Sequence, residues 1–331
     1  MKKLQKFGMF ILILIILSAC TSDASTDNGS EGTGNGEVPQ DIRIGASTIG
    51  GFWYTLAASM GEKMDELYSG TSHTVIEGGS ISNLAGLSDN TFEIAFSSGP
   101  MIHAANQGLE PFDEEIDNVS TIATFYPTAM HIVVQEDSDI YTIEDLQGKI
   151  VSPGVKGYGS ELAFIDILQV HGMSYDDLDR VEYVGTSDGA DLLRDSHIDA
   201  IATIAGVPNA VFQELATSIG VRFIPLENET VEQLNELNEG YITHELATED
   251  YDFLDESIPT IAPYTSLLAN DDVMSEDAVY ELTKMLFEET DRWKDISSIM
   301  DDFNAEYSME NNVGELNPGA EKYYKEIGVL E

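Results

Sequence analysis

Apolar and polar positions follow two periods from residue 41 onward, one typical of strands and one typical of helices. Residues 42–46 alternate in polarity and predict a short strand, and residues 56–67 carry apolar side chains at every third or fourth position. The same succession of strand, glycine turn and helix recurs over residues 74–87 and 93–106. Two further strands are expected over residues 119–134. This part of the chain is therefore predicted to be an α/β unit.

A second α/β set follows residue 137, and two sets in series predict two lobes. Its strands are expected at 150–151, 181–184, 198–204 and 221–226, and its helices at 160–172, 189–195 and 208–219. We expect Ser160 to cap the first of these helices, and its inner stripe to be Leu162, Ile165, Leu168 and Gln169. Residues 257–268 contain two prolines and predict an edge or crossover strand, and the tail after them is mostly helical.

The first twenty residues resemble a bacterial lipoprotein signal peptide. Three lysines precede an apolar run over residues 9–17 that is too short to span a bilayer comfortably, and Leu17-Ser18-Ala19-Cys20 follows. The resemblance implies cleavage before Cys20, acylation of its thiol, and a mature protein tethered to the outer face of the cytoplasmic membrane. The alternative is a plain secretory signal with an incidental cysteine. Cys20 is the only cysteine, so no internal disulfide can form.

Composition limits the partners of the mature chain. Residues 21–40 are almost free of apolar side chains and predict a flexible acidic linker. The whole chain has 15 Lys and Arg against 60 Asp and Glu, a formal net charge of −45. Such a surface repels nucleic acid and anionic lipid headgroups, so neither is expected as a partner. Excess acid also destabilises a compact state unless ions screen it, which predicts a source that lives in high salt or at high pH.

Three glycine-rich turns, each between a predicted strand and a predicted helix, are the candidates for ligand binding. They span residues 45–51, 77–84 and 152–161. Unpaired N–H groups at a helix N-terminus favour a carboxylate or phosphate, and these loops are expected to face one cleft at the carboxyl ends of the strands. Ser80 or Asn83 can donate to a ligand carboxylate, although Ser80 also fits an ordinary helix cap. Lys156 lies in the third loop, where a solvated lysine is the alternative.

An enzyme is the rival interpretation. The glycine spacing at 45, 50 and 51 does not fit a dinucleotide fold, and six scattered histidines with no H-E-x-x-H motif predict neither a metal nor a cofactor. The pattern G-x-S-x-G occurs over residues 185–189, between a predicted strand and a predicted helix. A triad would then need His197 or His244, and neither carries a sign of that role. A capped strand-to-helix turn explains the same residues, so we expect no enzymatic activity.

The order of these segments resembles the TAXI family of solute-binding proteins of TRAP (tripartite ATP-independent periplasmic) transporters. The matching stretches are residues 42–57, 76–99, 126–168 and 197–216. The resemblance implies a two-lobed periplasmic-binding-protein fold of type II character, with a hinge and an interlobe cleft. It also implies capture of a small organic anion by lobe closure, an amino acid such as glutamate or a dicarboxylate or keto acid. The ligand would then pass to a TRAP-type membrane permease driven by an ion gradient.

The resemblance also suggests how the chain is divided. Lobe 1 is expected over residues 41–127 and 226–331, and lobe 2 over 128–225, with the chain crossing the hinge more than once. A surface lipoprotein with a structural or adhesive role is the remaining alternative, and its sign would be sequence repeats, which are not found.

The resemblance further implies the ligand-binding residues. Those that match the family's motifs are Ser47, Thr48, Tyr54, Ser80, Asn83, Tyr126, Gly157, Ser160, Gly206 and Pro208. Lys156 and Ser97 complete the expected site. Ser97 belongs to a segment where the family usually has a Gln-x-Asp-like group, and Thr128 stands where the family often has an acid. These departures affect substrate preference, so the resemblance does not assign a particular substrate of the family to this chain.

Overall fold

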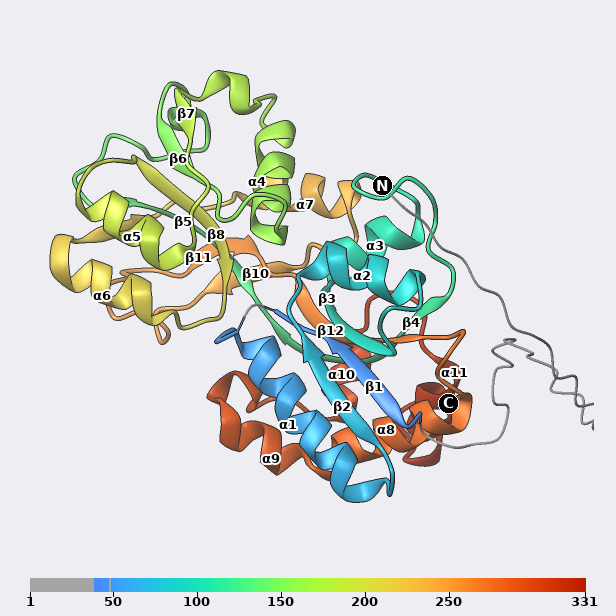
Figure 1. Cartoon of the computed structure of the whole chain (residues 1–331). Helices are drawn as coiled ribbons and strands as arrows, with labels where there is room; N and C mark the ends of the chain where they lie inside the picture. Colours follow the sequence, from blue (N-terminus) through green and yellow to red (C-terminus); the bar gives the residue numbers. More distant parts are fainter. Residues whose placement is uncertain (1–38, 48) are drawn as a thin grey trace, which may run out of the picture. The chain divides into compact units, whose positions relative to one another are not determined.

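The computed structural model describes residues 39–47 and 49–331 (Figure 1). The predicted signal peptide with its acylated Cys20, residues 21–38 of the predicted linker, and Thr48 lie outside the described residues. In the part of the chain that is described, no helix is long and apolar enough to cross a membrane.

The first lobe is built on a five-stranded mixed sheet. In spatial order its strands are β2 (Ser72–Ile76), β1 (Asp41–Gly45), β3 (Ile94–Ser98), β12 (Tyr264–Asn270) and β4 (Val119–Pro127). β1 pairs in parallel with β2 and β3, whereas β12 is antiparallel to both of its neighbours. A strand from the last quarter of the chain therefore lies inside the sheet of the first.

Helices cover both faces of this sheet. One face carries α1 (Phe52–Leu67), α8 (Glu276–Glu288), α9 (Thr290–Ile296), α10 (Ala305–Glu310) and α11 (Pro318–Glu326), and the other carries α2 (Ser80–Ser88) and α3 (Gly99–Asn106). Successive residues of β3 alternate between the faces: Ile94 and Phe96 pack in the cluster that contains α1, and Ala95 packs in the cluster that contains α2. Both faces of the sheet are thus buried, as in other α/β folds.

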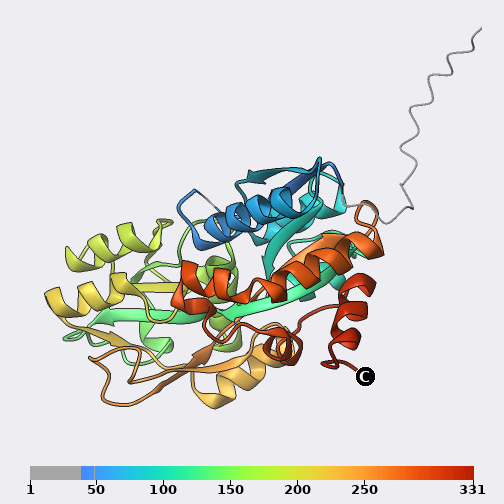
Figure 2. The same ribbon diagram turned by 90° about the horizontal axis from the view of Figure 1, so that it is seen from below.

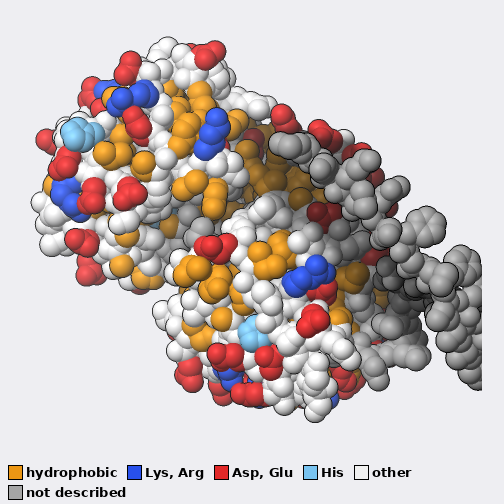
Figure 3. Space-filling model, viewed as in Figure 1, with side chains coloured by type: hydrophobic (Ala, Val, Ile, Leu, Met, Phe, Trp, Pro, Cys, Tyr) orange, Lys and Arg blue, Asp and Glu red, His pale blue; other side chains and the backbone are white. Residues whose placement is uncertain are grey.

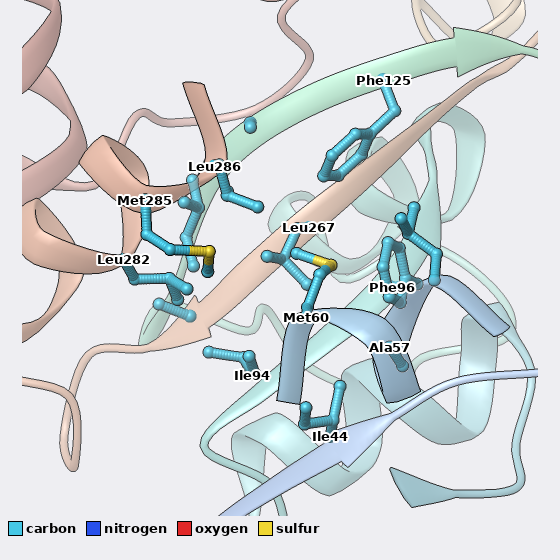
Figure 4. Packing of buried hydrophobic residues seen from close by; sticks show 14 of the residues in the cluster. Ile44, Ala57, Met60, Ile94, Phe96, Phe125, Leu267, Leu282, Met285 and Leu286 are labelled. Carbon is cyan, nitrogen blue, oxygen red and sulfur yellow. The ribbon is translucent and has the colours of Figure 1, made fainter. Parts of the chain in front are cut away.

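The larger of these two clusters joins distant parts of the sequence. Figure 4 shows Met60 of α1 beside Leu267 of β12, with Leu282 and Met285 of α8 close by. All four are almost fully buried, so the N-terminal helix and the C-terminal helices share one core.

The second lobe has its own mixed sheet. In spatial order its strands are β7 (Arg180–Val181), β6 (Ile150–Ser152), β8 (Ala200–Ala205), β5 (Ala129–Gln135) and β9 (Val221–Phe223). One face is covered by α4 (Gly159–Val170) and α7 (Asn228–Leu237), and the other by α5 (Thr186–Arg194) and α6 (Ala210–Ile219). The prediction of two α/β lobes is confirmed.

Two stretches of chain connect the lobes. β4 continues into β5, and together they form the long green run that passes from one sheet into the other (Figures 1 and 2). The second connection runs from β11 (Ile258–Ile261), which forms a two-stranded sheet with β10 (Thr243–Leu246), into β12. Thr128 N–H donates to the carbonyl of Pro263 at 2.9 Å, and the Thr128 hydroxyl donates to the same carbonyl at 3.1 Å. The two connections therefore lie side by side at the hinge.

The chain re-enters the first lobe later than residue 226, which was the expected boundary. Leu226, Val231, Leu234 and Ile261 pack in one core cluster with β5 and β8 of the second lobe. Because this apolar stretch is buried against the second sheet, residues 226–262 belong to the second lobe by packing.

The predicted edge or crossover strand over residues 257–268 is in fact two strands. Pro259 lies in β11, at the edge of a two-stranded sheet, and Pro263 lies between the strands. The proline-free stretch that follows forms β12, which is buried between β3 and β4. The central strand was missed because its partners are distant in sequence.

Helix α4 also differs in two details from its prediction. It begins at Gly159 with Tyr158 as the N-cap residue, two residues before the expected Ser160 cap. Ile165 is 38% exposed, and the buried stripe contains Phe164 and Ile167 instead. The pattern was ambiguous because this helix is apolar over much of its circumference.

Candidate ligand-binding cleft

A pocket of about 350 Å³ lies at the boundary of the two lobes, next to the hinge. The first lobe and the hinge contribute Ser47, Gly51, Phe52, Trp53, Gly78, Gly79, Ser80, Ser98, Tyr126, Thr128, Pro263 and Ile299. The second lobe contributes Tyr158, Gly159, Ser160, Ile204, Ala205 and Gly206. We call this pocket the cleft. Its volume suits a small organic molecule.

Four helix N-termini open onto the cleft. The N-cap or first residues of α1, α2, α3 and α4 all belong to its lining. The first N–H groups of a helix have no partner within the helix, and the helix dipole places partial positive charge at that end. The convergence of four such ends creates an environment that favours a negatively charged group.

One end of the cleft is rich in hydroxyl and backbone groups, and we call it the polar end. The Oγ atoms of Ser80 and Ser98 lie 3.1 Å apart there, across the starts of α2 and α3. From the other lobe, the ring of Tyr158 approaches Gly79 so closely that a Cβ on Gly79 would lie 3.6 Å from it. Ser160 Oγ accepts from the backbone N–H of Ile204 at 3.0 Å. Hydroxyl groups from both lobes are thus fixed around the same space.

The part of the lining beside the hinge carries large aromatic and aliphatic side chains, and we call it the hinge end. Phe52 packs against Tyr126 with a ring separation of 5.4 Å. Trp53 Nε1 donates to Thr265 Oγ1 at 3.2 Å, which leaves the indole ring as the surface that lines the cleft. Burial raises the pKa of the Tyr126 phenol well above its ordinary value, although hydrogen bonds to Thr265 and Trp53 oppose part of that shift. Tyr126 is therefore a neutral group at physiological pH.

Five of the residues expected at the ligand line the cleft. They are Ser47, Ser80, Tyr126, Ser160 and Gly206. They come from the ends of β1, β4 and β8 and from the starts of α2 and α4, in agreement with loops that meet at one edge of each sheet.

Asn83 and Ser97 lie behind the cleft instead. Both are fully buried. Asn83 Nδ2 donates to the carbonyls of Ala46 (2.9 Å) and Phe96 (2.8 Å), and Ser97 Oγ donates to the carbonyl of Ser80 (3.3 Å). These hydrogen bonds to the backbone just after β1 and within β3 hold the Asn83 side chain inside the lobe rather than at a ligand. Both residues hold the cleft-lining backbone in place.

Four further expected residues are outside the lining. Tyr54 N–H donates to Ser47 Oγ at 3.3 Å, but the Tyr54 ring packs in the core of the first lobe. Lys156 Nζ lies over the ring of Tyr183, 5.4 Å from its centre. Gly157 and Pro208 flank the lining without joining it. Thr48, the remaining expected residue, is not described.

The three glycine-rich turns that were predicted to face the cleft contain five further lining residues, Gly51, Gly78, Gly79, Tyr158 and Gly159. The lining residues outside these turns and outside the expected set are Phe52, Trp53, Ser98, Thr128, Ile204, Ala205, Pro263 and Ile299. Most of these adjoin a glycine turn or the end of a predicted strand. Pro263 and Ile299 had no local signal, because tertiary packing alone brings them to the cleft.

His131 of β5 does not line the cleft. His131 is fully buried, with Nε2 2.7 Å from Tyr251 Oη and Nδ1 2.9 Å from the carbonyl of Ala129. Burial lowers its pKa to about 3, so the ring is neutral at physiological pH. His131 therefore acts within the core of the second lobe.

The hydrolase-like pattern does not assemble into a triad within the described residues. Ser187 is exposed in the first turn of α5, and no hydrogen bond joins it to His197 or His244. In residues 39–47 and 49–331 no group of three or more His, Cys, Asp or Glu side chains is arranged to hold a metal ion.

The chain belongs to the NMT1-like family, whose model matches residues 44–328. Among solved structures it is similar to PhnD1 from Prochlorococcus marinus in complex with methylphosphonate. That match has 10% identity and a TM-score of 0.54, and covers 88% of this chain and 99% of the other. It is also similar to XAC2383 from Xanthomonas citri bound to chloride, with 12% identity, a TM-score of 0.51, and coverage of 88% and 98%.

A third similar structure is the periplasmic aliphatic sulphonate binding protein SsuA from Escherichia coli. It is 16% identical with a TM-score of 0.43, and the match covers 87% of this chain and 79% of the other. At these identities the comparisons concern the fold. The fold is the two-lobed periplasmic-binding-protein fold that the sequence predicted.

Proposed function

We propose that the protein is an extracytoplasmic solute-binding lipoprotein that captures a small organic anion and delivers it to a membrane permease. The cleft carries this proposal, because four helix N-termini from two lobes open onto one pocket of about 350 Å³. The fold and the family membership are consistent with such a role.

Capture by closure explains why the site is divided between two lobes. A ligand at the polar end contacts the starts of α2 and α3 in one lobe and the start of α4 in the other. The full set of contacts exists only when the lobes are close together, so the ligand stabilises the closed form. The adjacent connections at Thr128 and Pro263 supply the hinge about which the lobes rotate.

The transport partner that we propose is a TRAP-type permease, with the protein as a TAXI-like binding component. The order of the motifs in the sequence supports this assignment. The signal-like residues 1–20 support lipid attachment through Cys20 to the outer face of the cytoplasmic membrane, with residues 21–40 as the linker. Uptake of the bound solute into vesicles that contain a candidate permease should require this protein. Mass spectrometry of the mature N-terminus should show an acylated Cys20.

Ligand titration tests the binding role. The mature chain is titrated with amino acids, dicarboxylates and 2-oxo acids while tryptophan fluorescence is recorded. Trp53 lines the cleft, whereas Trp293 is fully buried in the core, so Trp53 is the reporter. We expect a saturable change with at least one compound. A flat response across the panel would count against solute binding and would favour a structural or adhesive lipoprotein. Ester hydrolysis that is lost in Ser187→Ala would instead reveal an enzyme.

We also propose that the protein works in high salt or at high pH, because its surface is strongly acidic. Figure 3 shows acidic side chains dispersed over the visible face. Salt screens repulsion among such charges, and the same screening lets an anion approach a negatively charged protein. The melting temperature should therefore rise between low and molar NaCl. A melting temperature that stays constant or falls would refute the high-salt version of the proposal.

A further inference from the structure

The cleft lining is uncharged. None of the described residues that line it is Lys, Arg, His, Asp or Glu. Charged residues make up 23% of the chain, so their absence from the lining is a property of the site rather than of the composition. A charged group on a ligand therefore finds only backbone dipoles and hydroxyls there.

Two carboxylates adjoin the lining in sequence, and both are bound elsewhere. Glu77 Oε1 accepts from the backbone N–H of Ile49 at 2.8 Å. Glu161 is buried, and its Oε2 accepts from the backbone N–H of Gly157. Each carboxylate holds a glycine-rich turn in shape, and neither is part of the cleft.

Lys156, the cation that was expected in the site, is also bound elsewhere. Lys156 Nζ lies over the ring of Tyr183, and neither residue lines the cleft. No lysine or arginine among the described lining residues is therefore available to neutralise a second negative charge on a ligand.

The cleft lacks groups that would stabilise an α-ammonium group on a ligand. It carries a full positive charge, and a buried charge is costly unless an opposite charge or several acceptors compensate for it. The lining offers no carboxylate, and the four helix N-termini present positive partial charge. The same groups that attract a carboxylate therefore repel an ammonium group on the adjacent carbon.

The cleft also lacks groups that would stabilise a second carboxylate on a ligand. The polar end can hold one anionic group at the starts of α2, α3 and α4. The hinge end presents Trp53, Pro263 and Ile299, which would desolvate a second anion without pairing it. Its shape and chemistry suit an apolar body.

We infer that the ligand is an organic monoanion with an apolar body and no ammonium group, and we commit to a branched-chain 2-oxo acid as its class. This inference rests on the proposed function, since it specifies the solute of the same cleft. The carboxylate lies at the polar end, and the branched chain lies against the indole of Trp53 and the side chain of Ile299.

Isothermal titration of the mature chain with matched ligands tests the inference. 4-Methyl-2-oxopentanoate is compared with leucine, which replaces the oxo group by an ammonium group, and with 2-oxoglutarate, which adds a carboxylate. Glutamate carries both changes. We expect the first compound to bind about tenfold or more tightly than each of the others, the ratio that one uncompensated charge produces.

A charge placed at the hinge end sharpens the test. Ile299→Lys should raise the affinity for 2-oxoglutarate relative to 4-methyl-2-oxopentanoate by about tenfold, because the ammonium group pairs with the second carboxylate. Ile327→Lys adds the same charge at a position that is 43% exposed and outside the cleft, and should leave the ratio unchanged.

Binding of leucine, glutamate or 2-oxoglutarate to the unaltered protein as tightly as the 2-oxo acid overturns this inference and leaves the solute-binding role intact. Binding of none of the four compounds also overturns it. The solute-binding role is refuted only if no compound of the broader fluorescence titration changes the tryptophan signal.

Discussion

The two walls of the cleft are built from glycine turns that look alike in sequence but differ in what they present. In the first lobe, β2 ends at Ile76 and α2 begins at Ser80, so the short turn places Gly78 and Gly79 in the lining. In the second lobe, β6 ends at Ser152 and α4 begins at Gly159. That longer loop directs its central residues away and contributes only its last residues to the cleft.

The difference shows that a glycine turn before a helix does not by itself place its residues at a ligand. Gly78, two residues before α2, lines the cleft, whereas Gly157, two residues before α4, does not. The first lobe also supplies three of the four helix N-termini. The first wall is therefore expected to carry most of the binding energy, and the second wall to complete the enclosure.

Replacement of Gly79 should have the largest effect on binding. The backbone of Gly79 is extended, so Gly79→Trp causes no backbone strain. The new side chain would occupy the space between α2 and Tyr158, where a Cβ already lies within contact distance of the ring. We expect binding to weaken by more than about 100-fold, or about 2.7 kcal/mol, with the fold retained.

The matched control is Gly185→Trp, at the cap of α5, where no atom lies within 4 Å of an added Cβ. Calorimetry and circular dichroism of both variants provide the measurement. Binding by Gly79→Trp at the unaltered affinity would show that the lobes do not close at this point.

Loss of Asn83 should affect stability rather than direct ligand contact. Asn83→Ala removes two donors to buried carbonyls, so the free energy of unfolding should fall by about 2–3 kcal/mol. Chemical denaturation measures this change, and Asn228→Ala, at an exposed helix start, is the control. An unchanged free energy of unfolding combined with a loss of affinity would restore Asn83 as a ligand-contacting residue.

Ser80 should show the opposite behaviour. Ser80→Ala removes a hydroxyl at the polar end whose side-chain partner among the described residues is Ser98 Oγ, so affinity should fall by about 1–2 kcal/mol with little change in stability. Ser187→Ala removes an exposed serine from the start of α5 and should alter neither quantity. Equal affinities for the two variants would place the ligand away from the start of α2.

Replacement of Lys156 should have the smallest effect on affinity. Because its ammonium group lies over Tyr183 and outside the cleft, Lys156→Ala should change affinity by less than about 0.5 kcal/mol. The value is best measured at high salt, where long-range charge effects are screened. A tenfold loss of affinity would mean that the second wall supplies a cation on closure, which would contradict the expectation that the first wall carries most of the binding energy.

The sequence was sufficient to predict the two lobes because strand and helix periods are local properties. The order of strands was not predictable by this route. β12 occupies the centre of the first sheet although it lies far along the chain from its neighbours β3 and β4. Likewise, the apolar residues of α7 indicate burial but not which lobe buries them.

The polar end of the cleft was partly predictable for the same reason. Ser80 and Ser160 adjoin glycine turns, and a helix start after a strand is a recognisable signal. Asn83 was misplaced because its amide binds the carbonyls of Ala46 and Phe96 in the interior of the lobe, contacts that the local sequence does not reveal. Ile299 was missed because it reaches the cleft only through the packing of the C-terminal helices.

A crystal structure of the mature chain with a bound solute tests the central claim most directly. The account predicts one ligand in the cleft, with its anionic group at the starts of α2 and α4 and contacts to both lobes. A ligand held by one lobe alone, or seated away from the starts of these helices, would contradict it.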